Sequence, residues 1–111
     1  MDVFSALAAP LRRKIIEILA TRGRLPATAI FDEFRTSPSA ISQHLKVLRD
    51  AHLVSVEKAG QRRVYKLNMN NVREIEFWTK KITWLWNKRL GALEEMARIE
   101  KEELLKRERG G

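Results

Sequence analysis

Polar side chains with hydrogen-bonding ends recur along one face of a predicted helix in the middle of the chain. Glutamine can pair bidentately with adenine, serine with several bases, and lysine with guanine or phosphate. On the opposite face, Ile41, Leu45 and Leu48 follow the i, i+4, i+7 spacing of a buried stripe. Taken alone, the polar stripe fits a solvated helix face as well as a base-reading one. It comprises Ser39, Ser42, Gln43 and Lys46.

The residues before this helix predict where it begins. Ser37 can cap the helix and Pro38 can occupy its first position. Because helix N-termini attract anions, Ser37 is also a candidate phosphate contact. His44 lies beside the polar stripe, where it is either a partly buried hydrogen-bonding residue or a contact to phosphate or base.

A second group of candidates flanks a predicted hairpin turn. Two β-type runs, 53–58 and 62–67, are separated by Ala59-Gly60-Gln61. Lys58, Arg62 and Arg63 would follow DNA phosphates or enter the minor groove, or else protect an edge strand. Two adjacent arginines at a turn favour DNA. A further basic cluster, 12–14, is open to three interpretations: a solvated face, a phosphate clamp or a dimer contact.

Composition supports an anionic partner. The 111 residues include 22 Lys and Arg against 14 Asp and Glu, for a net charge of +8. Residues 1–71 hold 12 basic and 6 acidic side chains, a net of +6, so most of the excess lies there. Nucleic acid is the first expectation and a membrane surface the second. Zero cysteines exclude a disulfide framework and thiolate metal sites. No apolar run approaches a bilayer span and no signal peptide opens the chain, so a cytoplasmic protein is expected.

The pattern of apolar residues predicts a mostly α fold with a two-stranded β-wing, which is a winged helix-turn-helix followed by a long C-terminal dimerisation helix. Asn71 and Glu74 are expected to cap that last helix. We expect a DNA-binding domain over 1–71, the dimerisation helix over 72–108 and a frayed tail over 109–111. The elements are predicted as helices over 3–9, 10–22, 27–34 and 38–50, strands over 53–58 and 62–67, and a helix over 72–107.

The long helix carries more apolar surface than one small domain can cover. It would extend roughly 50 Å, whereas a compact 100-residue domain has a radius of gyration of only ~13 Å. A second copy of the chain is the expected cover, and an aromatic-lined ligand pocket between subunits is the alternative. The predicted interface face comprises Ile75, Trp78, Ile82, Leu85, Trp86 and Leu93.

Three segments resemble the arsenical-resistance-repressor (ArsR) family of transcription regulators. They are residues 4–19, the helix and its exit over 39–54, and the wing over 60–67. The resemblance covers about residues 3–68 and implies a homodimeric DNA-binding repressor. It also implies that helices from both ends of the chain form the dimer, which adds Phe4 and Leu7 to the interface.

This chain departs from the family pattern at informative positions. The stretch 25–34 lacks the cysteine of metal-sensing members and the last helix lacks histidine, so a metal-independent member without a cofactor is expected. His52 stands where the family usually has glycine. That position requires a left-handed backbone, which we expect to cost ~1 kcal/mol with histidine.

The sequence therefore predicts a sequence-specific transcriptional regulator, a homodimeric repressor on a pseudo-palindromic operator. The alternative is a winged-helix protein-interaction module that binds DNA without sequence preference. The sequence does not identify the effector of such a regulator, which could be a small molecule or a protein. An enzyme is not expected, because the chain lacks cysteine and a Gly-rich phosphate loop, and neither His44 nor His52 has an evident catalytic partner.

Overall fold

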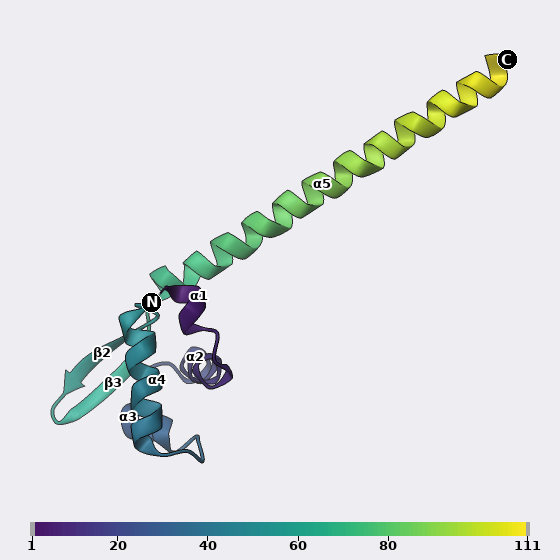
Figure 1. Cartoon of the computed structure of the whole chain (residues 1–111). Coiled ribbons are helices and arrows are strands. Elements are labelled where there is room, and N and C mark those ends of the chain that lie inside the picture. The colour runs from purple at the N-terminus through teal and green to yellow at the C-terminus, as the bar shows by residue number, and fades with distance from the viewer. Residues whose placement is uncertain (1, 111) are drawn as a thin grey trace. The chain divides into compact units, whose positions relative to one another are not determined.

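The computed structural model describes residues 2–110, which divide into two compact units between Ile75 and Glu76. The first unit contains the short elements and the second is the greater part of the last helix (Figure 1). The fold is mostly helical, as predicted. The elements are α1 (Val3–Ala6), α2 (Pro10–Arg22), β1 (Leu25–Pro26), α3 (Ala27–Phe31), α4 (Pro38–Asp50), β2 (Val54–Ala59), β3 (Arg62–Leu67) and α5 (Met69–Gly110).

One apolar core holds the first unit together. The predicted stripe of α4 is confirmed, since Ile41, Leu45 and Leu48 are all 0–1% exposed. They pack with Ile15 and Ile30, which α2 and α3 bring into the same cluster. Burial of each such side chain stabilises the fold by about 1.5–3 kcal/mol. The core therefore fixes which side of α4 faces outward.

The sheet has one strand more than predicted. The hairpin of β2 and β3 pairs Val54 with Leu67 and Ala59 with Arg62, so only Gly60 and Gln61 form its turn. Strand β1 pairs antiparallel with the other edge of β3, giving the order β1-β3-β2. This two-residue strand anchors β3 to the rest of the unit at Tyr65, which is buried.

Both ends of α4 behave as the sequence predicts. The Ser37 hydroxyl accepts a hydrogen bond from the Ala40 backbone N–H at 3.2 Å, and Pro38 occupies the first turn. Past the other end, His52 has a φ of 58°. This is the left-handed backbone that was expected where the family usually has glycine. The chain therefore reverses sharply into the buried Leu53.

Helices α1 and α3 are shorter than predicted. Helix α1 ends at Ala6 instead of Ala9, and α3 ends at Phe31 instead of Phe34. Asp2 caps α1 by accepting from the Ser5 N–H, and this backbone hydrogen bond lowers the pKa of its carboxyl group. Helix α2 ends as predicted, because Gly23 adopts a φ of 79°.

The predicted cap of the last helix is wrong. Helix α5 begins at Met69, and the Val72 N–H already donates to the Asn68 carbonyl at 3.1 Å. Asn71 thus lies inside the helix, where its amide donates to the Ala51 carbonyl. The helix continues through residues 109 and 110, which were expected to fray, and residue 111 lies outside the described chain. At about 1.5 Å per residue, its 42 residues extend about 63 Å.

Candidate nucleic-acid interface

The outer face of α4 is polar and accessible. Ser39, Ser42, Gln43 and Lys46, the predicted base-reading stripe, are all exposed, and so is the capping Ser37. Because the opposite stripe is locked into the core, the helix cannot rotate to hide them. This face can therefore present serine, glutamine and lysine to a groove of double-stranded DNA.

The wing concentrates positive charge at its turn. Lys58 lies directly across the ladder from Arg63, and Arg62 pairs with Ala59. Like charges opposite each other on neighbouring strands are destabilising. An anion bound at this turn, such as a DNA phosphate, would relieve that repulsion.

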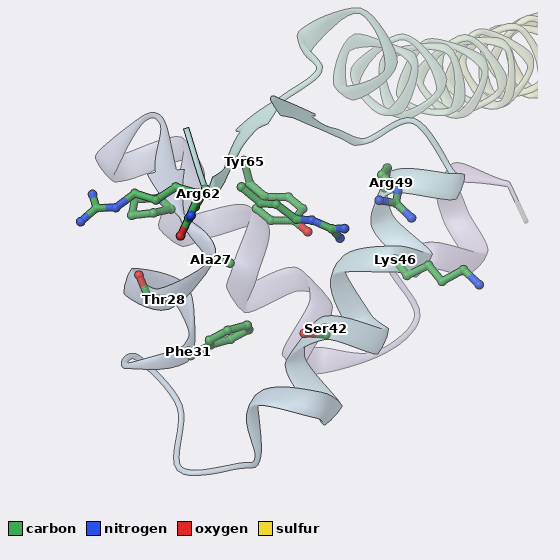
Figure 2. Close-up of a pocket in the computed structure, with 11 residues that line it drawn as sticks. Ala27, Thr28, Phe31, Ser42, Lys46, Arg49, Arg62 and Tyr65 are labelled. Atoms are coloured by element: carbon green, nitrogen blue, oxygen red, sulfur yellow. The ribbon is translucent and has the colours of Figure 1, made fainter. Parts of the chain in front are cut away.

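A cleft of about 470 Å³ lies between the wing, α3 and α4. Figure 2 shows Ser42, Lys46 and Arg49 along α4, with Phe31 of α3 facing them and Tyr65 of β3 above. Polar groups surround an apolar floor, and Ser42 and Lys46 of the predicted base-reading stripe meet the wing arginines here. Ser39 and Gln43 of the same stripe are not among the lining residues. The lining residues are Pro26, Ala27, Thr28, Phe31, Ser42, Lys46, Arg49, Gln61, Arg62, Arg63 and Tyr65.

Three cations of the first unit that lie outside this cleft are held in ion pairs. Arg22 bonds Glu33 at 2.5 Å, while Arg24 and Lys66 share Glu57 at 2.9 and 3.4 Å. In contrast, the cleft cations form no ion pair with any residue of the described chain. Their charge is available to a partner. They are Lys46, Arg49, Arg62 and Arg63.

The comparisons with known proteins agree with this geometry. The family profile described as bacterial regulatory protein, arsR family, matches residues 9–56. The HTH-type transcriptional regulator Rv2034 of Mycobacterium tuberculosis is 40% identical over 85 residues, covering 72% of this chain and 78% of that protein. The transcriptional repressor SdpR of Bacillus subtilis is 35% identical, covering 69% of this chain and 84% of that protein.

The chain belongs to the ArsR family. Its fold matches the solved structure of the ArsR-like transcriptional regulator from Rhodococcus sp. RHA1 with a TM-score of 0.73 and 27% identity, covering 86% of this chain and 89% of that one. It is thus a DNA-binding transcriptional regulator with a winged helix-turn-helix fold. The predicted family and fold are confirmed.

Arg12 and Arg13 of this ArsR-family chain have a role that none of the three sequence interpretations contained. The Arg12 Nε–H donates to the Ala6 carbonyl at 2.6 Å, and the Arg13 guanidinium donates to the Leu7 carbonyl at 2.6 Å. Both side chains therefore satisfy carbonyls at the end of the four-residue helix α1. A helix this short has too few internal hydrogen bonds to persist alone.

Arg12 also reaches α4. Its guanidinium lies 3.3 Å from Nδ1 of His44, which is half-buried. The structure thus gives His44 a contact within the chain, in line with the hydrogen-bonding interpretation. One guanidinium consequently connects α1 to the helix that carries the polar stripe.

The predicted dimer residues fall into two groups. Leu7 and Ile75 pack partly against the core of the first unit, and Phe4 is 40% exposed. On α5, none of the described residues is buried. Its predicted interface residues are 43–57% exposed and share one helix face by their spacing. They are Trp78, Ile82, Leu85, Trp86 and Leu93.

Seven of the eleven lining residues were not predicted as site residues, including Arg49, Thr28, Phe31 and Gln61. Arg49 carries a sequence signal, since it continues the Ser42 and Lys46 spacing by three residues along α4. Thr28 and Phe31 carry none, because the packing of α3 against both α4 and β3 brings them to the cleft. Gln61 comes from the hairpin turn.

Residues 2–110 contain no cluster of three His, Cys, Asp or Glu side chains placed to hold a metal ion. None of the helices in that range combines the length and apolar character needed to cross a bilayer.

Proposed function

We propose that this protein is a homodimeric repressor that binds a pseudo-palindromic operator through α4 and the wing. In each protomer, α4 enters the major groove and its serine and glutamine side chains select the sequence. The wing cations follow phosphates beside that groove. The two α4 helices would lie about 34–36 Å apart, one turn of DNA.

One observation carries this proposal: two residues of the exposed α4 stripe, Ser42 and Lys46, border the same cleft as two wing arginines. These arginines, Arg62 and Arg63, have no ion pair within the described chain. Phosphate contacts position a protein on DNA, whereas contacts to base edges specify the sequence. Gln43 and Ser42 supply the second kind of contact. Lys58, Arg62 and Arg63 supply the first, and Ser37 adds one at the start of α4.

The dimer part of the proposal rests on α1 and α5. Packing the α5 face against a second copy would remove large exposed side chains from solvent. Each Å² of apolar surface buried in this way stabilises the dimer by about 25 cal/mol. Phe4, Leu7 and Ile75 would extend this contact. ArsR-family regulators usually act as dimers, which favours a second copy as the cover. The site of action would be the cytoplasm, where promoter DNA is found in bacteria and archaea.

Salt dependence tests the phosphate contacts. If each subunit neutralises ~3 phosphates, log K should fall against log salt with a slope near −5. Fluorescence anisotropy with a labelled duplex between 50 and 300 mM salt (~ a sixfold range) measures that slope. A nearly flat response would contradict the proposal.

Sequence choice needs a separate experiment. Selection of bound duplexes from a random pool should enrich an inverted repeat whose half-sites are one helical turn apart. Enrichment of a single half-site would contradict the twofold arrangement. Binding with no enriched sequence would instead support the protein-interaction module, for which α5 would be the docking element.

A further inference from the structure

We propose that the cleft between α3, α4 and β3 binds a small organic anion with a flat apolar body, and that this ligand competes with DNA. The inference rests on the proposed function, because the cations that would hold the ligand are those proposed to follow phosphates. It identifies both the site and the chemistry of an effector, which the sequence left open.

The floor of the cleft is the first argument. Phe31 and Tyr65 place two aromatic rings there, beside Pro26 and Ala27 (Figure 2). Tyr65 is 6% exposed and is fixed by the β1–β3 ladder, so it forms the base of the floor, and the half-buried Phe31 offers the accessible ring. A DNA phosphate has no apolar surface to bury against such a floor. A flat hydrocarbon or aromatic body does, and rings stack favourably on rings.

The rim supplies the recognition of negative charge. None of the described residues that line the cleft is acidic. Arg49, Arg62 and Arg63 have no ion pair within the described chain, and arginine binds carboxylate, sulfonate or phosphate groups bidentately. Ser42 and Gln61 offer hydrogen bonds between these cations and the floor.

The size of the cleft sets an upper bound on the ligand. Its volume of about 470 Å³ lies in the range of about 300–1,000 Å³ typical of small-molecule sites. Lys46 and Arg62 are exposed and extend away from the cleft in Figure 2, so Arg62 must turn inward to reach the charged group of a ligand. An aromatic acid of two fused rings would therefore occupy the floor and place its charged group among the arginines.

Competition follows from the shared residues. A ligand seated among Arg49, Arg62 and Arg63 neutralises charge that DNA needs and lies against Ser42 of the base-reading stripe. Pure competition raises the apparent Kd for DNA by the factor 1 + [L]/Kd, or about elevenfold at ten times the ligand's Kd. A small anion without an apolar body, such as acetate, should not raise the apparent Kd for DNA in this way.

The first experiment measures binding without DNA. Equilibrium dialysis of the full chain with 2-naphthoate as the probe should give saturable binding at one molecule per chain, and acetate at the same concentration should not displace it. A folded protein that binds DNA and retains no 2-naphthoate would overturn this inference and leave the proposed function standing.

The second experiment places the probe in the cleft. Ala27→Leu fills part of the floor and should weaken 2-naphthoate binding at least tenfold, while Ala20→Leu, at an exposed position of α2, should not change it. If Ala27→Leu fails to fold, Thr28→Glu puts a negative charge on the exposed rim and should also weaken binding, with Thr28→Gln as its matched control. Unchanged binding in the folded cleft variants would mean that the probe binds elsewhere, and the inference would fail.

The third experiment measures competition. Added 2-naphthoate should weaken binding to a selected duplex by the factor above, and the effect should disappear in Ala27→Leu. An equal effect of acetate would show a general salt response and overturn the competition. If the wild-type chain bound 2-naphthoate but no duplex at all, the proposed function would fail, and the dialysis result would still establish the site.

Discussion

The residues before Glu76 and those from Glu76 onward differ in which side chains they expose to water. The first unit buries most of its large apolar side chains, and the cations that line its cleft have no ion pair within the described residues. The second unit pairs its charges along the helix, as Arg98 does with Glu95 and Glu102, and leaves its tryptophans exposed. The first unit thus has its own apolar core and presents cations that an anion could bind. The second unit has no buried core of its own and exposes apolar side chains that another apolar surface could cover.

The largest expected effect tests whether the first unit depends on its own core. Leu45→Ala should lower the free energy of unfolding by about 2–5 kcal/mol, because it opens a cavity where the side chain is 1% exposed. Urea denaturation followed by circular dichroism measures the change. Ser42→Ala, three residues earlier on the exposed face, is the control and should alter stability by less than about 0.5 kcal/mol. Equal effects would break the contrast between the two faces of α4.

The next effect tests whether α5 needs a partner. Trp86→Ala should weaken self-association by about 2 kcal/mol or more, or about thirtyfold, because tryptophans dominate the energetics of interfaces. Sedimentation equilibrium over a range of protein concentrations measures the dimer constant. Asn87→Ala, at the neighbouring position outside the predicted interface face, should leave it unchanged. A wild-type chain that stays monomeric at micromolar concentration, with and without target duplex, would refute the dimer.

A third pair of variants separates base reading from phosphate contact within the first unit. Gln43→Ala should relax sequence preference by about 1–3 kcal/mol at one base pair, whereas Arg62→Ala should weaken binding to all duplexes alike. Competition assays with single-base operator variants measure both. The reverse outcome would mean that the roles of α4 and the wing are exchanged.

The smallest effect concerns the exit from α4. His52→Gly should raise the free energy of unfolding by about 1 kcal/mol, since glycine adopts a φ near 58° without a Cβ penalty. Ala20→Gly, at an exposed position in the last turn of α2, should lower it by up to about 1 kcal/mol. Thermal denaturation of the two variants should give shifts of opposite sign. A destabilised His52→Gly would mean that the histidine side chain makes a compensating contact.

Local signals made α4 predictable from the sequence. Ser37 and Pro38 specify its start, and the apolar stripe specifies its buried face. Both are encoded within a few residues of each other. The same is true of the hairpin, whose strands alternate around a turn containing Gly60. The exposed stripe and the wing cations could therefore be assigned to the same face of the unit.

Non-local contacts were not predictable in the same way. Strand β1 contains two residues and exists only because Tyr65, forty positions later, pairs with Leu25. Asn71 has the sequence signal of a cap, yet the helix has already begun and its amide bonds a distant carbonyl. The cleft has the same origin, since Phe31 and Arg63 meet only after the wing has folded against α3.

The hydrogen bonds of Arg12 have a consequence for mutagenesis. Replacing this side chain by alanine would release two carbonyls of α1 and the contact to His44 in one step. An alanine scan would then record weaker operator binding at a position with no nucleotide beside it. Protection mapping should show no DNA contact at this residue, although its substitution weakens binding. That difference would identify Arg12 as a structural link between the N-terminal turn and the DNA-facing helix.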